Sequence, residues 1–407
     1  MPHRAECKSF YLFSTAQRRF FALGGSMHRL CSIVILFFAF TASLAQAQDD
    51  SERNGRAFNI GFGNTGLSFG NSPRHNGLRF NWSDRDVEEI NGFSFTIWKP
   101  AEELSGTVNG LAFGIVGPAA VNINGVALGG LAVLARDRLN GISIGGLAIV
   151  SQGSVTGSNI GGLAIVSQGS VTGLSIGGLA IVSQGTVTGL NLSGLAIVGK
   201  SNIRGLTVGG LACVSEGSLD GLNIGGMACV SQGSISGLSI GGLALVGKER
   251  LNGINIGGLA LVSEGRVGFL NIGGLAVVGL DGISGVTIGG VGIVSKKDIV
   301  GLNVTLGDLR SDKPDDDTSI KGINVGGYRI RAKEISGVNI SLVMTQAEHA
   351  RGLMVGCYNR AEGTQRGISI GLYNHATELF GIQIGILNRA ENNPEYFRLL
   401  PLLNLHF

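Results

Sequence analysis

The chain of 407 residues has few of the residues from which enzyme sites and nucleic-acid interfaces are built. Only 6% of its residues are aromatic and 14% are charged, and its 6 histidines are scattered along the sequence. Few aromatic residues in so long a chain argue against an ordinary globular core. A nucleic-acid-binding protein concentrates lysine and arginine on one face, whereas the net charge here is only +3. We therefore expect no nucleic-acid partner.

The cysteines and acidic residues form no recognisable metal site. Cys213 and Cys229 stand 16 residues apart, where other repeats have isoleucine. A metal site needs further ligands at a fixed spacing, and neighbouring parallel strands have poor geometry for a disulfide. The acidic run "RSDKPDDDTS" lacks the spaced ligands and the glycine of a calcium loop. We predict no cofactor and interpret both cysteines as small buried apolar residues.

The N-terminus has an apolar run that is too short to cross a bilayer as a helix. This run extends from about Leu30 to Leu44, follows a basic start at Met27, and precedes the small residues Ala45 and Ala47. A transmembrane helix needs about 20 apolar residues, whereas a shorter run before a small-x-small site is typical of a signal peptide. We predict export, with cleavage before Gln48.

Glycine is abundant, with 69 residues, and most of it belongs to an internal repeat. The letters "GGLAIVSQGSVTG" occupy residues 145–157 and return at residues 161–173. Gly-Gly pairs recur every 16 residues from Gly129 to Gly289, with Ser193-Gly194 in the one gap. Apolar, often β-branched residues alternate with glycine and small polar residues, and no helical period is present. The repeat therefore predicts short strands joined by tight turns.

Two all-β architectures accommodate such a repeat: a β-solenoid and an up-and-down barrel. In a barrel consecutive turns lie at opposite ends, yet "SQGSVT" occurs in consecutive units at Ser151 and Ser167. No unit from Gly129 to Val294 gains or loses a residue, and the aromatic girdles of a membrane barrel are missing. We predict a β-solenoid of about 17 short rungs, roughly 80 Å long, with an outer-membrane β-barrel as the alternative.

The expected organisation has six parts along the chain. Segments at both ends depart from the repeat and would cover the open strand edges of a solenoid. The last segment, "LLPLLNLHF", is apolar on both faces, which favours a buried cap over an assembly signal that ends in Phe407. The parts are a leader and signal peptide (1–47), an N-terminal cap (48–108), 16-residue repeats (109–308), an acidic loop (309–321), 15-residue repeats (322–392) and a C-terminal cap strand (393–407).

The segment "LAIV" of each repeat is apolar at every position, so both faces of its strand carry apolar side chains. Only one face can point into the rung, and the other would form a stripe for a partner, a membrane or a second copy. The register of Ala164 and Val182 belongs to the opposite face. The candidate interaction stripe is Ile149, Ile165, Ile181, Ile197, Cys213, Cys229, Leu245, Leu261, Val277 and Ile293.

The charged residues of the repeats differ in kind from unit to unit and fall in the turns. A catalytic site needs titratable groups that converge on one place, so we expect no enzyme, with a carbohydrate-active β-helix enzyme as a distant third reading. Threonine rows that could bind a crystalline surface occupy only three units, the last of them ending at Thr188. Such an array is too short to support that function.

The repeats resemble those of uncharacterised bacterial surface-repeat proteins, which have "GLxIGGLAxV" units, "GIQIGLLN"-type later repeats and a terminus with Pro-Leu-x-Asn. The matching stretches are "NGLRFNW" (76–82), "VNGLAFGIVGPA" (108–119), the 16-residue block, "GIQIGILNRAENNP" (381–394) and "LLPLLNLHF" (399–407). The resemblance implies a location in the cell envelope, the outer membrane or the surface of a Gram-negative-type bacterium, and it supplies no activity or binding residues.

These observations predict an exported, non-enzymatic repeat protein with a structural or adhesive role. Its partner would be an unknown protein, a glycan, an envelope surface or a second copy of the chain. A pore or anchor in the form of an outer-membrane β-barrel is the alternative function.

Overall fold

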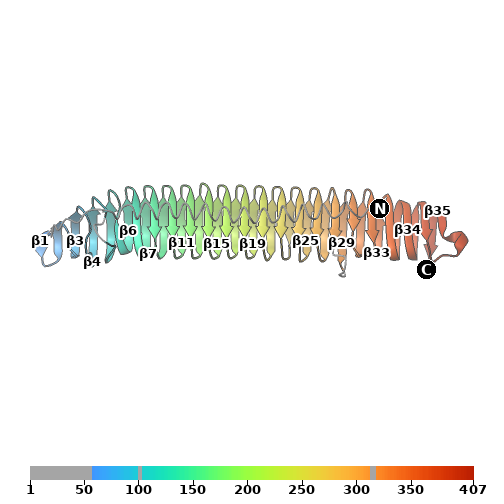
Figure 1. The fold of residues 1–407 in the computed structure, drawn as a ribbon, viewed down its shortest axis with the longest axis horizontal. Helices are drawn as coiled ribbons and strands as arrows, with labels where there is room; N and C mark the ends of the chain where they lie inside the picture. The colour runs from blue at the N-terminus through green and yellow to red at the C-terminus, as the bar shows by residue number, and fades with distance from the viewer. Residues whose placement is uncertain (1–56, 100–102, 312–317) are drawn as a thin grey trace. The chain divides into compact units, whose positions relative to one another are not determined.

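The computed structural model describes residues 57–99, 103–311 and 318–407, which form an all-β solenoid of about 18 turns (Figure 1). In these residues the only helix is the short 3₁₀ helix η1 (Glu395–Phe397). The predicted leader and signal peptide, residues 1–47, lie outside the described residues.

Each 16-residue repeat makes one turn with two strands, a longer one such as β11 (Val171–Gly177) and a shorter one such as β10 (Ala164–Ser167). Longer strands pair only with longer strands and shorter with shorter, always in parallel and with equivalent residues opposite each other, for example Ile165 and Ile181. The structure therefore confirms the predicted solenoid. The alternative barrel requires antiparallel neighbours along the repeat, and these repeats do not have them.

The two sheets contain the following strands. The longer sheet has β2 (Thr65–Phe69), β3 (Arg74–Asn81), β4 (Glu89–Thr96), β5 (Thr107–Gly114), β9 (Ser154–Gly161), β11, β13 (Val187–Ser193), β15 (Ile203–Gly209), β17 (Leu219–Gly225), β19 (Ile235–Gly241), β21 (Leu251–Gly257), β23 (Leu270–Gly273), β25 (Ile283–Gly289), β27 (Ile299–Thr305), β29 (Ser319–Gly326), β31 (Glu334–Ser341) and β33 (His349–Val355). The shorter sheet has β8 (Ala148–Ser151), β10, β12 (Ala180–Ser183), β14 (Ala196–Gly199), β16 (Ala212–Ser215), β18 (Ala228–Ser231), β20 (Ala244–Gly247), β22 (Ala260–Ser263), β24 (Ala276–Gly279), β26 (Gly292–Ser295), β28 (Asp308–Ser311), β30 (Arg329–Arg331) and β32 (Met344–Ala347). Three strands contribute to both sheets: β6 (Ala119–Gly129), β7 (Ala132–Gly145) and β34 (Tyr358–Ala390).

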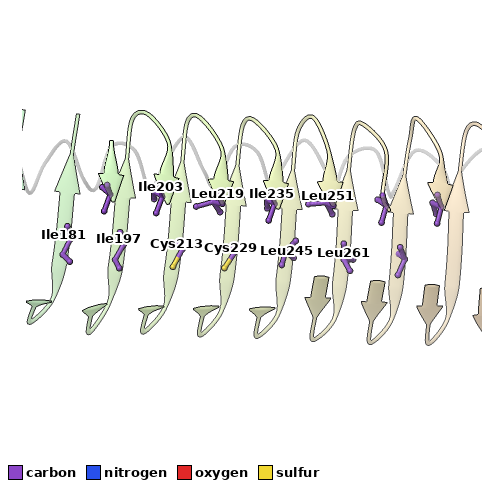
Figure 2. Packing of buried hydrophobic residues seen from close by; sticks show 14 of the residues in the cluster. Ile181, Ile197, Ile203, Cys213, Leu219, Cys229, Ile235, Leu245, Leu251 and Leu261 are labelled. Atoms are coloured by element: carbon purple, nitrogen blue, oxygen red, sulfur yellow. The ribbon is translucent and has the colours of Figure 1, made fainter. Parts of the chain in front are cut away.

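The interior holds two apolar columns that face each other across every rung. One column comes from the shorter strands and the other from the start of the longer strands, and both are fully buried through the central repeats. Because every rung repeats the last, each side chain packs on its own equivalents above and below. Figure 2 shows the first column at Ile197, Cys213 and Cys229 and the second at Ile203, Leu219 and Ile235.

Polar side chains also line the interior, two residues after a glycine in each longer strand. Asn159, Ser175, Asn191 and Thr207 at this position are all fully buried. Where consecutive rungs have asparagine, the amides bond along the stack, as from Asn255 to the side-chain oxygen of the next rung at 3.0 Å. A buried amide needs such a partner, and consecutive asparagines supply it, whereas the amides of Asn159 and Asn191, which stand between serine or threonine residues, have no hydrogen-bond partner.

The glycine before this polar position adopts a backbone conformation that other residues avoid. Gly173 has a φ of +108°, and a Cβ on it would lie 2.3 Å from the carbonyl oxygen of Gly157 in the neighbouring rung. Glycine at this position of the longer strand therefore permits both the bend of the strand and the close approach of successive rungs.

We expect Gly173→Ala to destabilise the solenoid by more than about 1 kcal/mol, because both the dihedral angle and the contact are incompatible with a methyl group. Thermal unfolding followed by circular dichroism measures the effect. Gly292→Ala is the matched control, since Gly292 stands opposite Ala276 and its Cβ would lie 3.5 Å from its nearest neighbour. An equal loss of stability in both variants would contradict this explanation of the glycine column.

The N-terminal segment that we predicted as a cap contains rungs instead. Strands β2 to β5 stack in parallel, with Gly66, Gly77, Gly92 and Gly110 in one column that continues into the repeats. The correction has a simple cause: the turns between these glycines vary in length, which hides the period in the sequence. The stack ends instead at β1 (Phe58–Phe62), which pairs antiparallel with β2.

At the other end, β35 (Leu399–His406) pairs antiparallel with β34. The expectation that this strand is buried on both faces is wrong, because Leu402 and Phe407 are 76% and 86% exposed. Of the predicted acidic loop, residues 312–317 lie outside the described residues. The strands on either side keep the register of the stack, with Gly301 opposite Gly322.

Candidate interaction surface

The predicted interaction stripe lies inside the solenoid. All ten residues, from Ile149 to Ile293, have 0% exposure and belong to the apolar column of the shorter strands. The rung interior must be filled, and the large side chain at this position fills it, while the neighbouring Ala and Val belong to the opposite face of the strand. The assignment of the stripe to these residues is therefore wrong, and a surface for partners must come from other positions.

The exposed apolar surface runs along the turn between the longer and the shorter strand. The residue at the tip of this turn is large and apolar in every central repeat and is 38% to 50% exposed. The tip residues are Leu147, Leu163, Leu179, Leu195, Leu211, Met227, Leu243, Leu259 and Leu275.

Two further apolar columns point outward from the longer strands beside this turn. They flank the buried polar position, so that Leu190 is 38% exposed and Ile160 is 40% exposed while Asn159 and Asn191 are fully buried. On the other side of the turn, the outward residues of the shorter strands are small or branched, such as Ala180. We call this surface, over the rungs from Ile142 to Leu302, the apolar edge.

Charged residues in the same rungs lie elsewhere on the solenoid. Those between residues 142 and 302 all occupy the opposite turn or the outward position that follows it, and the last rung has two more, Asp308 and Arg310, on its shorter strand. Arg204 and Asp220 in adjacent rungs form an ion pair of 3.6 Å, and Lys297 beside Asp281 holds the pKa of that carboxyl below its usual value. These groups are solvated and partly paired with one another. We call this side the polar edge.

Aromatic residues extend the apolar surface toward the N-terminal end of the stack. Phe69, Phe80, Phe95 and Phe113 occupy one outward column in successive rungs, with ring centroids 5.3 to 6.0 Å apart. Trp98 is 50% exposed. The apolar surface is therefore aromatic at this end and aliphatic along the repeats.

A polar ladder separates the apolar columns of the longer sheet from the charged turn. Five asparagine side chains in successive rungs, from Asn76 to Asn140, bond to one another at 2.8 to 3.1 Å. Thr156 continues the register of Asn140, followed by the other threonines of the rows in the sequence. The threonine rows in the sequence did not indicate these asparagines. Each asparagine nevertheless stands directly before a glycine of the column, as each threonine does.

A buried ion pair lies inside the first rungs and was also missed from the sequence. Arg79 is fully buried and donates to Asp84 at 2.6 Å and to Asn71 at 3.0 Å. Asn81 and Thr96 also donate to the Asp84 carboxylate, each at 3.0 Å. Arg79 stands two residues after Gly77, at the inward polar position of its rung, so this register could have revealed its burial.

We expect Asp84→Ala to unfold the first rungs, because it leaves the Arg79 guanidinium buried without an anion, at a cost of about 3 to 5 kcal/mol. Rungs interact mainly with their neighbours, so the loss should stay local. Hydrogen exchange should show reduced protection in β2 to β4 and unchanged protection in β15 to β21. Glu88→Ala, which breaks the exposed pair with Arg74 in the same rungs, should change little, and equal effects would refute the assignment.

The two repeat cysteines are buried core residues. Cys213 and Cys229 face each other in adjacent shorter strands, both as free thiols with 0% exposure. The hydrogen bond with Cys213, together with burial, raises the pKa of the Cys229 thiol far above its usual range. Cys229 therefore stays protonated, as a small core residue does.

Two further features of the described residues concern membranes and metals. None of their helices is long and apolar enough to cross a membrane. These residues also contain no group of three or more His, Cys, Asp or Glu side chains that could hold a metal ion. The acidic run of the predicted loop lies mostly outside the described residues.

Comparison with known proteins gives no relative for this chain. No family model matches it, and no curated protein or solved structure matches it. The interpretation of the surface therefore depends on the solenoid itself.

Proposed function

We propose that the protein is an exported, non-enzymatic repeat protein of the bacterial cell envelope or surface, and that it acts by binding through its apolar edge. The observation that carries the proposal is the separation of the two edges. Between residues 142 and 302 every charged residue is on the polar edge, while the apolar edge keeps a large exposed aliphatic residue in each turn. Soluble monomers rarely expose apolar surface on this scale.

The dimensions of the apolar edge suit a stable contact. Its 11 rungs extend for about 50 Å at about 4.8 Å per rung, and its outward columns span roughly 15 Å. This gives roughly 800 Å², which is the area that each partner contributes to a standard protein interface. Because the rungs are identical in register, the surface is straight and regular, and it fits an extended apolar partner better than a small ligand.

The polar edge supports a structural rather than a catalytic role. Its charges are distributed along the stack, between none and three per rung, and some pair across neighbouring rungs as Arg204 and Asp220 do. Distributed, solvated charges keep such a rod in water, while catalysis needs converging groups of perturbed pKa. One edge in contact with an envelope component and one in water is the arrangement that we infer.

The test places lysine at the tips of three consecutive turns, Leu163→Lys, Leu179→Lys and Leu195→Lys. In the matched control the same three rungs receive lysine on the polar side, at Thr156, Thr172 and Thr188. Both proteins should fold and be exported, with a mature chain that begins at Gln48. Only the first should move from the envelope fraction to the soluble fraction of the expressing bacterium. Retention of both variants in the envelope would overturn the role of the apolar edge.

A further inference from the structure

Strand β1 is the terminal strand of the stack and has one unpaired edge among the described residues. It forms a two-residue hairpin with β2 through Gly63 and Asn64, and all five of its residues are exposed. Figure 1 shows β1 in blue at one end of the solenoid. Alternate residues of β1 therefore direct backbone N–H and C=O groups away from the protein, as an edge strand does.

Nothing in β1 protects this edge. Natural sheet edges are blocked by charges, proline or bulges, and the sequence of β1, "FNIGF", contains no charge and no proline. The opposite end of the stack is different. There β35 contains Pro401, Leu402 has a φ of +65°, and the pairing shifts register between Gly385 and Asn388. One end is open to another strand, and the other end is blocked.

The open strand is complementary to itself. When two copies of β1 pair antiparallel about Ile60, Phe58 of each copy lies opposite Phe62 of the other, and Ile60 lies opposite Ile60. Residues at alternate positions share a face, so all three apolar side chains of each copy meet on one face, with Asn59 opposite Gly61 on the other. Directly opposed apolar side chains are what stabilise antiparallel pairs.

We propose that two copies of this chain join head to head through β1. The two longer sheets then become one continuous sheet across a two-fold axis at Ile60, and the unpaired backbone groups of both edges bond to each other. The outward phenylalanine column, which begins with Phe58 opposite Phe69, continues across the axis. Because each copy has one open end, the assembly closes as a dimer and does not grow into a filament.

The pairing needs little area, so its concentration dependence is part of the prediction. Five residues from each copy form a contact well below the roughly 800 Å² per partner of a standard interface. We expect reversible association, which should be followed by mass measurement up to about 1 mM, the range in which weak complexes dissociate. Small-angle scattering of the dimer should give a maximum dimension near twice that of the monomer.

Substitution of Ile60 tests the two-fold axis, because this residue faces its own copy. Ile60→Lys and Ile60→Glu should each be monomeric, since like charges oppose each other at the axis, and an equimolar mixture of the two should restore the dimer. Leu78→Lys is the control: Leu78 is 50% exposed in the same outward column but two rungs inside the stack, and this variant should still dimerise.

The remaining outcomes separate this dimer from other contacts. The triple lysine variant of the apolar edge should keep the head-to-head dimer, so failure of the proposed function would not disturb this result. A full-length chain that stays monomeric near 1 mM would overturn the proposal and indicate that another segment covers β1. A dimer no longer than the monomer, or a charge-paired mixture that stays monomeric, would overturn it as well.

Discussion

Lysine at Ile165, Ile181 and Ile197 should unfold the central rungs, whereas lysine at the neighbouring Leu163, Leu179 and Leu195 should leave the solenoid folded. The three isoleucines are fully buried and the three leucines are 38% to 45% exposed. Truncation of a buried isoleucine costs about 2 to 5 kcal/mol, and a buried unpaired ammonium adds a further desolvation cost. At the turn tips the introduced ammonium groups reach water directly.

Unfolding should extend from the three substituted rungs to their neighbours, because each rung is stabilised by the rungs on either side. Circular dichroism should show a large loss of strand signal in the isoleucine variant, and hydrogen exchange should locate that loss between β8 and β16. Retention of a native spectrum by the isoleucine variant would mean that these side chains are not the core. Unfolding of both variants would mean that the turn tips are also packed.

The fold could be predicted because the period constrains the backbone so strongly. A repeat of constant length whose turns do not alternate in kind is compatible with stacked rungs and excludes strands of alternating direction. The parallel register of Val155, Val171 and Val187 follows directly. The faces of the strands could not be predicted in the same way. In "AIVS" the isoleucine shares a face with the serine, and a serine-bearing face is usually the one that meets water.

The structure shows why this expectation fails. The inward serine hydroxyls bond to the backbone of the preceding rung, with Ser167 donating to the Gly153 carbonyl at 2.6 Å and Ser183 to that of Gly169 at 2.7 Å. These bonds satisfy the serine inside the rung. The longer strand also buries a polar residue and exposes an apolar one, because Asn159 is buried and Ile160 is exposed. The longer strand thus has small polar residues inside, beside the two apolar columns, and aliphatic residues outside, and this partial reversal of the usual pattern creates the apolar edge.

Deletion of one complete unit, residues 161–176, should shorten the solenoid by about 4.8 Å and leave it folded. The cut joins Ile160 to Gly177, which is equivalent to its present neighbour Gly161, and it brings β8 against β12 and β9 against β13 in the existing register. Only one of many similar rung interfaces is lost, so the stability of such a stack falls by a single increment.

Deletion of half a unit, residues 161–168, is the matched control and should disrupt the stack. It removes β10 but keeps β11, so the remaining eight residues must either shift register or loop out at the turn. Turns of this kind have no room for extra residues, because successive rungs are in close contact there: a Cβ on the equivalent Gly210 would lie 1.9 Å from the Gly194 carbonyl oxygen of the adjacent rung. The full-unit variant should keep a melting temperature near that of the parent protein, and the half-unit variant should lose both strand signal and cooperative melting. Equal tolerance of the two deletions would show that a rung does not need to be in register with its neighbours. That result would contradict the stacked architecture, which requires this register.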